Sequence, residues 1–170
     1  MPNTLRFLPS GAGIRRWLLL AALCAASVAS ATDLHAYWDD RCQGCHGDSG
    51  PFARSTLALR DGRLVGRHHV DDLPRFLRQH YLADALVAPV TAMLRAQVAT
   101  PPLYAARCAG CHGVASAFAR EALVLRDGTL FARGRGRPVA DVLGRHGGLS
   151  PDEQPAMLQT LLRVRREVGG

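Results

Sequence analysis

The sequence predicts a mostly helical chain made of two copies of one small unit. When Cys42 is aligned with Cys108, short identical stretches recur at the same spacing from residue 41 onward, and we call this the repeat alignment. Helix start and stop signals recur in the same order in both copies. Aromatic residues make up only 6% of the chain, so each unit would have a thin core unless another group fills its interior.

The duplication is clearest around two cysteine motifs. Residues 41–47 read RCQGCHG, and residues 107–113 read RCAGCHG. In the same repeat alignment, residues 59–62 match residues 125–128. We therefore predict two domains, residues 32–99 and residues 100–170, with the joint at Thr100-Pro101-Pro102.

Residues 1–31 have the pattern of a cleaved signal peptide. Three arginines precede an apolar run over residues 17–26, which is too short to span a bilayer, and the small residues of Ala29-Ser30-Ala31 follow. A retained membrane anchor is the alternative interpretation. We expect cleavage after about Ala31, a periplasmic location, and no stable membrane insertion of the mature chain.

Each unit is predicted to begin with a helix that runs into the cysteines. Asp33 is expected to cap the first of these helices and Thr100 the second. Gly47 and Gly113 are expected to end them.

An irregular middle with one local signal follows in each copy. Apolar residues alternate around Asp61-Gly62 and Asp127-Gly128, which indicates either a hairpin or a turn with extended flanks. Further helices are expected over residues 72–81 and 138–146, over residues 82–98, and from a cap at Ser150.

Both motifs have the form Cys-x-x-Cys-His, which is the attachment pattern of haem c. One helical turn places two thiols where they can add to the two vinyl groups of one porphyrin, and the adjacent imidazole can then bind the iron. We therefore expect two covalent haem c groups, held by Cys42, Cys45 and His46 and by Cys108, Cys111 and His112.

Other uses of the cysteines explain the pattern less well. Zinc needs four ligands close together, yet Cys45 and Cys108 stand far apart in the sequence. A redox dithiol or a structural disulfide requires neither the adjacent histidine nor its second copy.

The two motifs resemble those of the cytochrome c family. Trp38 and Tyr104, which precede the first cysteine of each motif by one helical turn, and the start of the closing helix at residues 149–153 support the resemblance. It implies an all-α fold of two tandem class I-like helical domains wrapped around the haems, with room for a short hairpin in each. It also implies haem addition after export and one-electron transfer.

The second axial ligand of each iron departs from the usual pattern of this family. A methionine usually precedes the last helix, whereas here His146 stands there, and His80 is its counterpart in the repeat alignment. The two histidines therefore have the same spacing from their proximal histidines. We expect His80 and His146 to bind the irons and to give low-potential bis-His haems, although a matched histidine can also serve in a cap or a core.

Several other residues compete for these roles. Met93 and Met157 could bind iron, but Met157 lies on an apolar helical stripe that is typical of core packing. His68 and His69 are private to the first copy and are expected in an exposed loop, with replacement of the first distal histidine as the alternative. His35 is expected at the surface.

Charge does not indicate nucleic acid as a partner. The net charge of +7 falls to +4 without residues 1–31, which hold three of the 21 cations and none of the 14 acids. Haem propionates would bring the sum near zero. Four duplicated arginines are expected either to pair with propionates or to cover a solvated face: Arg60, Arg126, Arg67 and Arg133.

The expected function is single-electron transfer without catalysis. A membrane or dehydrogenase donor would reduce the chain, and a periplasmic acceptor would oxidise it, either freely or within a fixed enzyme complex. A haem enzyme or gas-binding protein is the alternative, because one open iron site, with His68 and His69 nearby, would allow such chemistry.

Overall fold

The computed structural model describes residues 32–67 and 71–169 of the chain. The expected signal peptide, residues 1–31, and the pair His68 and His69 lie outside the described residues. The described residues belong to one compact unit, Ala31–Gly170. None of their helices is long and apolar enough to cross a bilayer.

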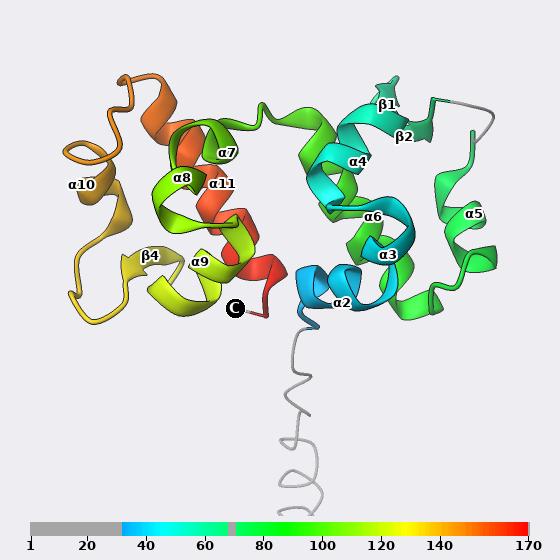
Figure 1. Ribbon diagram of the computed structural model, residues 1–170, viewed down its shortest axis with the longest axis horizontal. Coiled ribbons are helices and arrows are strands. Elements are labelled where there is room, and N and C mark those ends of the chain that lie inside the picture. Colours follow the sequence, from blue (N-terminus) through cyan, green and yellow to red (C-terminus); the bar gives the residue numbers. More distant parts are fainter. Residues whose placement is uncertain (1–31, 68–70, 170) are drawn as a thin grey trace, which may run out of the picture. The chain divides into compact units, whose positions relative to one another are not determined.

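The two copies fold into the same order of elements (Figure 1). In each, short helices around the cysteine motif precede a hairpin, another short helix and one long helix. The first copy contains α2 (Leu34–Arg41), α3 (Gln43–His46), α4 (Ser49–Thr56), β1 (Leu57–Arg60), β2 (Arg63–Gly66), α5 (Leu73–Gln79) and α6 (Asp84–Ala99). The second contains α7 (Leu103–Arg107), α8 (Ala109–His112), α9 (Ala115–Ala122), β3 (Leu123–Arg126), β4 (Thr129–Ala132), α10 (Val139–Leu143) and α11 (Glu153–Glu167).

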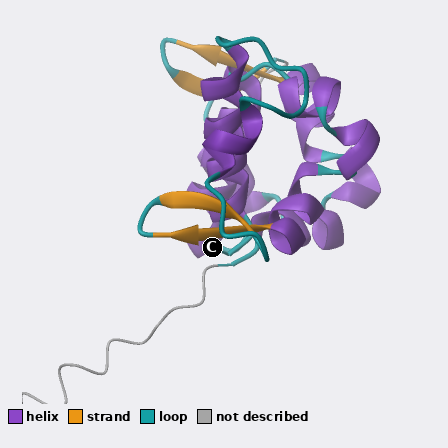
Figure 2. Ribbon diagram, turned by 90° about the vertical axis from the view of Figure 1, so that its left-hand side faces the viewer, coloured by secondary structure: helices purple, strands orange, loops and turns teal. Residues whose placement is uncertain are grey.

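The expected all-α class is wrong. Helices account for 59% of the described residues, and each copy adds an antiparallel two-stranded sheet, so the fold is mixed α and β (Figure 2). The physical reason is the Asp-Gly pair, since Asp61 and Gly62 have φ values of 50° and 71°, and Asp127 and Gly128 have 47° and 76°. Positive φ at both central residues is the geometry of a tight hairpin turn. The hairpin interpretation of these turns is therefore correct.

Strand pairing follows the same register in both hairpins. Leu57 pairs with Gly66, and Leu123 pairs with Ala132. A matched arginine then ties each hairpin to the preceding helix: Arg67 donates to the Leu57 and Arg54 carbonyls at 3.0 and 2.8 Å. Arg133 donates likewise to the Leu123 and Arg120 carbonyls, at 3.4 and 3.2 Å. These two duplicated arginines therefore stabilise the fold in this structure.

Helices α4 and α9 occupy the stretch that the sequence indicates to be irregular. Each begins shortly after a glycine of positive φ, Gly47 or Gly113. Each contains one fully buried alanine, Ala53 in α4 and Ala119 in α9, both with 0% exposure. Because alanine has no side-chain atom beyond Cβ, these helices can pack closely against the long helix of their own copy.

Helix caps agree with the sequence in part, since α11 begins at Glu153 and has Asp152, not Ser150, at its N-cap position. Asp33 accepts a hydrogen bond from the Ala36 amide at 2.8 Å, as expected of an N-cap. Ser150 and Glu153 form a reciprocal capping box before α11. Thr100 does not cap α7; it ends α6, and its hydroxyl donates to a carbonyl of that helix.

Each copy has its own hydrophobic core, centred on its long helix. The largest fully buried side chains are Met93 and Leu94 in the first copy and Leu123 and Met157 in the second. Both methionines therefore pack in the cores, as the apolar stripe predicts for Met157.

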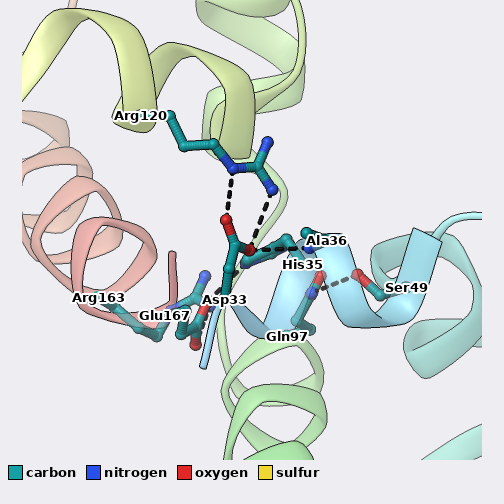
Figure 3. A network of polar contacts seen from close by, with 8 residues as sticks. All are labelled: Asp33, His35, Ala36, Ser49, Gln97, Arg120, Arg163 and Glu167. Carbon is teal, nitrogen blue, oxygen red and sulfur yellow. Dashed lines mark hydrogen bonds and ion pairs between the residues drawn. The ribbon is translucent and has the colours of Figure 1, made fainter. Parts of the chain in front are cut away.

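Polar contacts join the start of α2 to the second copy (Figure 3). Arg120 donates to both carboxylate oxygens of Asp33, at 2.6 and 3.0 Å. His35 contacts Glu167 at 2.9 Å, and Glu167 also pairs with Arg163. The prediction of a surface position for His35 is wrong, because its side chain is only 13% exposed.

Candidate functional site

Each cysteine motif forms one compact helical turn. The His46 amide donates to the Cys42 carbonyl at 2.9 Å, and the His112 amide donates to the Cys108 carbonyl at 3.0 Å. Helices α3 and α8 therefore carry the second cysteine and the histidine of each motif, and the first cysteine is the N-cap residue of the same turn. The backbone angles of the first cysteines are nearly identical, with φ −119° at Cys42 and −121° at Cys108.

The fold brings the motif histidine of each copy to the expected distal histidine. The ring centroids of His46 and His80 lie 5.8 Å apart, and those of His112 and His146 lie 5.7 Å apart. In the second pair the two Nε2 atoms face each other at 3.4 Å. In both copies the chain therefore folds back so that the second histidine lies beside the motif histidine.

Aromatic side chains hold the motif histidines in the same way in both copies. Phe52 packs on His46 with a centroid distance of 4.6 Å, and Phe118 packs on His112 at 4.7 Å. Both phenylalanines come from the helices that sequence reasoning missed, α4 and α9. Phe52 and Phe118 are matched in the repeat alignment, and this match was the signal that could have found them.

The aromatic residues before the motifs are both buried but differ in their polar contacts. Trp38 donates its indole N–H to the Gly47 carbonyl at 2.9 Å and so fixes the end of α3. The Tyr104 hydroxyl is buried and has no hydrogen-bond partner among the described residues. Burial, together with the nearby Cys108 thiol, raises the pKa of Tyr104 to about 12, so its hydroxyl stays protonated.

The first cysteine of each motif is partly buried and the second is exposed. Burial raises the pKa of the Cys42 and Cys108 thiols. Cys108 Sγ also contacts Met157 Sδ at 4.0 Å.

A cavity of about 910 Å³ lies against the second motif. Cys108, Cys111, His112 and His146 all line it, and so does Tyr104. This volume is in the range of cofactor sites. Met157 does not line the cavity, so its position favours packing over iron binding.

Arginines surround this cavity, but most of them are not duplicated. Arg107, Arg135, Arg137 and Arg145 line it. Of these, only Arg107 falls on another arginine in the repeat alignment. Arg126, which is duplicated, lies instead over the Phe131 ring, with its guanidinium carbon 5.9 Å from the ring centroid. The duplicated arginines singled out in the sequence are therefore not the ones that line the cavity.

These residues fit a covalent porphyrin in the second copy. The two thiols and the imidazole share one turn, and a second imidazole faces the first. Two imidazoles that bind one metal ion from opposite sides have nitrogens about 4 Å apart, since such bonds are about 2 Å long, and 3.4 Å is near this value. The guanidinium groups supply partners for carboxylates.

The zinc alternative finds no such support. The residues of ranges 32–67 and 71–169 contain no group of three or more His, Cys, Asp or Glu side chains placed to hold a metal ion. A haem iron needs only two protein ligands because the porphyrin supplies four nitrogens.

Comparison with known proteins gave no match, since no family model, curated protein or solved structure is significantly similar to this chain.

Proposed function

We propose that this protein is an exported dihaem c-type cytochrome that carries single electrons. The observation that carries the proposal is a repeated Cys-x-x-Cys-His turn with a second imidazole beside the first in both copies. Haem c, when bound, supplies reversible one-electron chemistry at iron. The periplasm would be its location, with a membrane or dehydrogenase donor and a periplasmic acceptor as partners.

The side chains have distinct tasks in this proposal. Cys42 and Cys45 would hold the first porphyrin through thioether bonds, and His46 and His80 would bind its iron. In the second copy the same tasks fall to Cys108, Cys111, His112 and His146. With two imidazoles on each iron, neither iron would have a free position for a substrate, which favours electron transfer over catalysis.

The ligand set also predicts the redox range. Imidazole donates electron density more strongly than a thioether and so favours ferric iron, whereas methionine ligation raises the potential. Met93 and Met157 lie within the hydrophobic cores. We therefore expect two low-potential haems.

Optical and EPR spectra of the purified holoprotein, with and without carbon monoxide, test the proposal. Two low-spin haems with no methionine–iron absorption band and no carbon monoxide complex are expected. His146→Ala should convert half of the haem to a form that binds carbon monoxide, and His80→Ala should convert the other half.

His35→Gln is the matched control, because His35 contacts Glu167 and neither motif. Its spectrum should be that of the unaltered protein. Carbon monoxide binding by the unaltered protein would contradict the closed-site proposal and favour a haem enzyme or gas-binding protein. A spectrum unchanged by His146→Ala would exclude His146 as a ligand.

A further inference from the structure

The charges around the cavity of the second copy are mostly positive. Arg135, Arg137 and Arg145 line it, together with one carboxylate, Asp141. None of these three guanidinium groups lies within ion-pair distance of a carboxylate of the described residues. Arg107 is already engaged, since it pairs with Glu153 at 3.0 Å.

The first copy carries different charges at the equivalent positions. In the repeat alignment, Asp71 stands in place of Arg137 and Gln79 in place of Arg145. Arg75 takes the position of Asp141, and His69, outside the described residues, that of Arg135. The duplication has thus kept the cysteine and histidine ligands but placed an excess of arginine on one copy only.

Positive charge beside a redox centre favours its reduced form, because reduction adds one negative charge to the site. The effect is larger in a partly enclosed cavity than in open solvent, since fewer water molecules screen the charges. A planar guanidinium can also hold a carboxylate through two hydrogen bonds and so stays close to the porphyrin edge.

We propose that Arg135, Arg137 and Arg145 make the second site the higher-potential member of the pair. This inference rests on the proposed function. Electrons from the donor would then pass from ferrous iron in the first copy to ferric iron in the second. The exchange moves one electron, so one iron is oxidised and the other reduced, with no bond or proton change. The acceptor would be reduced from the arginine-lined site.

Spectroelectrochemical titration of the holoprotein tests the inference. Two separate one-electron midpoints are expected. His146→Met should raise the higher midpoint and leave the lower one in place, because a thioether ligand favours ferrous iron. The variant Arg135→Gln/Arg137→Gln/Arg145→Gln should lower the higher midpoint and bring the two together.

All three arginines are exposed in the structure, so their replacement leaves the core intact. Arg126→Gln is the matched control, since Arg126 is in the same copy but does not line the cavity; both midpoints should stay close to their original values. Replacement of the three arginines by lysine should preserve most of the separation if charge is its cause.

Two outcomes would overturn the inference: a His146→Met shift of the lower midpoint, or an unchanged separation after the three arginines are neutralised. Neither outcome affects the dihaem proposal. A protein that holds no haem, or shows no reversible one-electron steps at all, would instead reject the proposed function.

Discussion

The Asp33–Arg120 pair should couple the two copies energetically. Arg120 donates to both oxygens of Asp33, at 2.6 and 3.0 Å, and the two side chains are 25% and 33% exposed for Asp33 and Arg120. The double variant Asp33→Asn/Arg120→Gln and its two single variants form a thermodynamic cycle. Asparagine keeps the N-cap contact to Ala36, because it caps helices as well as aspartate does.

The expected coupling energy between Asp33 and Arg120 follows from the exposure of the two side chains. Fully exposed ion pairs contribute about 0.2–1 kcal/mol, and hydrogen bonds to charged groups contribute about 1.5–3 kcal/mol. A bidentate pair that is mostly but not fully buried should fall between these classes. The coupling energy expected in the free energy of unfolding is therefore about 1 kcal/mol, at the boundary between the two classes.

Denaturant titration of the four proteins at neutral pH measures this coupling. Arg54→Gln is the matched control, since Arg54 is the counterpart of Arg120 but its side chain makes one long hydrogen bond, of 3.5 Å, to the Gln97 carbonyl and no ion pair with the described residues. Its coupling to Asp33 should be near zero. A coupling below about 0.3 kcal/mol for Arg120, within the range of ordinary additivity error, would refute the reasoning.

The same pair predicts a pH dependence. Partial burial would raise the pKa of Asp33, but the hydrogen bonds from Arg120 and the Ala36 amide and the nearby positive charges outweigh it, so the pKa lies below its ordinary value. A lowered pKa in the folded state means that this stabilisation is complete above the unfolded-state pKa of about 3.9 and is lost as the pH falls through the folded-state value. The stability difference between the unaltered protein and Asp33→Asn should therefore be constant near neutral pH and shrink in acid. A constant difference down to strongly acidic pH would contradict this pKa assignment.

Three further predictions concern single residues. Tyr81 has a φ of +61° and is 96% exposed. Tyr81→Gly should raise the free energy of unfolding by about 1 kcal/mol because it removes left-handed strain, and a lower denaturation midpoint would count against this. Met157→Ala should lower that free energy by about 2–5 kcal/mol, since Met157 is fully buried, with low-spin spectra retained; a new carbon monoxide complex would show instead that Met157 binds iron. His35→Gln should lower it by about 1 kcal/mol through the strained or lost contact to Glu167, and an unchanged midpoint would show that this contact contributes nothing.

Short sequence signals predicted the turns and helix ends, because these features depend mainly on neighbouring residues. The Asp61-Gly62 and Asp127-Gly128 turns needed only their own residues, so the hairpins could be expected even though the family resemblance implied an all-α fold. Gly47 and Gly113 likewise mark the ends of the motif helices in the structure.

Contacts between distant residues could not be predicted in this way. His35 meets Glu167 near the other end of the chain, and nothing near His35 in the sequence indicates that partner. Helix α9 has Val114 at its N-cap position, a residue type that rarely caps helices, so the usual start signal was missing there. Helix α4 has Asp48 at its N-cap position, but the Asp48 side chain makes no capping hydrogen bond.

The repeat alignment predicted some residues of the candidate site correctly and misled us about others. It pointed to His80 and His146, and the structure places both beside the motif histidines. It also drew attention to Arg67 and Arg133, which instead bind backbone carbonyls. A residue kept in both copies can serve the fold as well as the site, and most lining arginines of the second cavity were missed because they are not repeated.

The central claim is tested most directly by the intact mass of the exported chain under denaturing and reducing conditions. Our account predicts the mass of the polypeptide after cleavage near Ala31 plus two covalently attached haems. The variant Cys108→Ser/Cys111→Ser should retain only one. A polypeptide without attached haem, purified from cells that mature c-type cytochromes, would contradict the account.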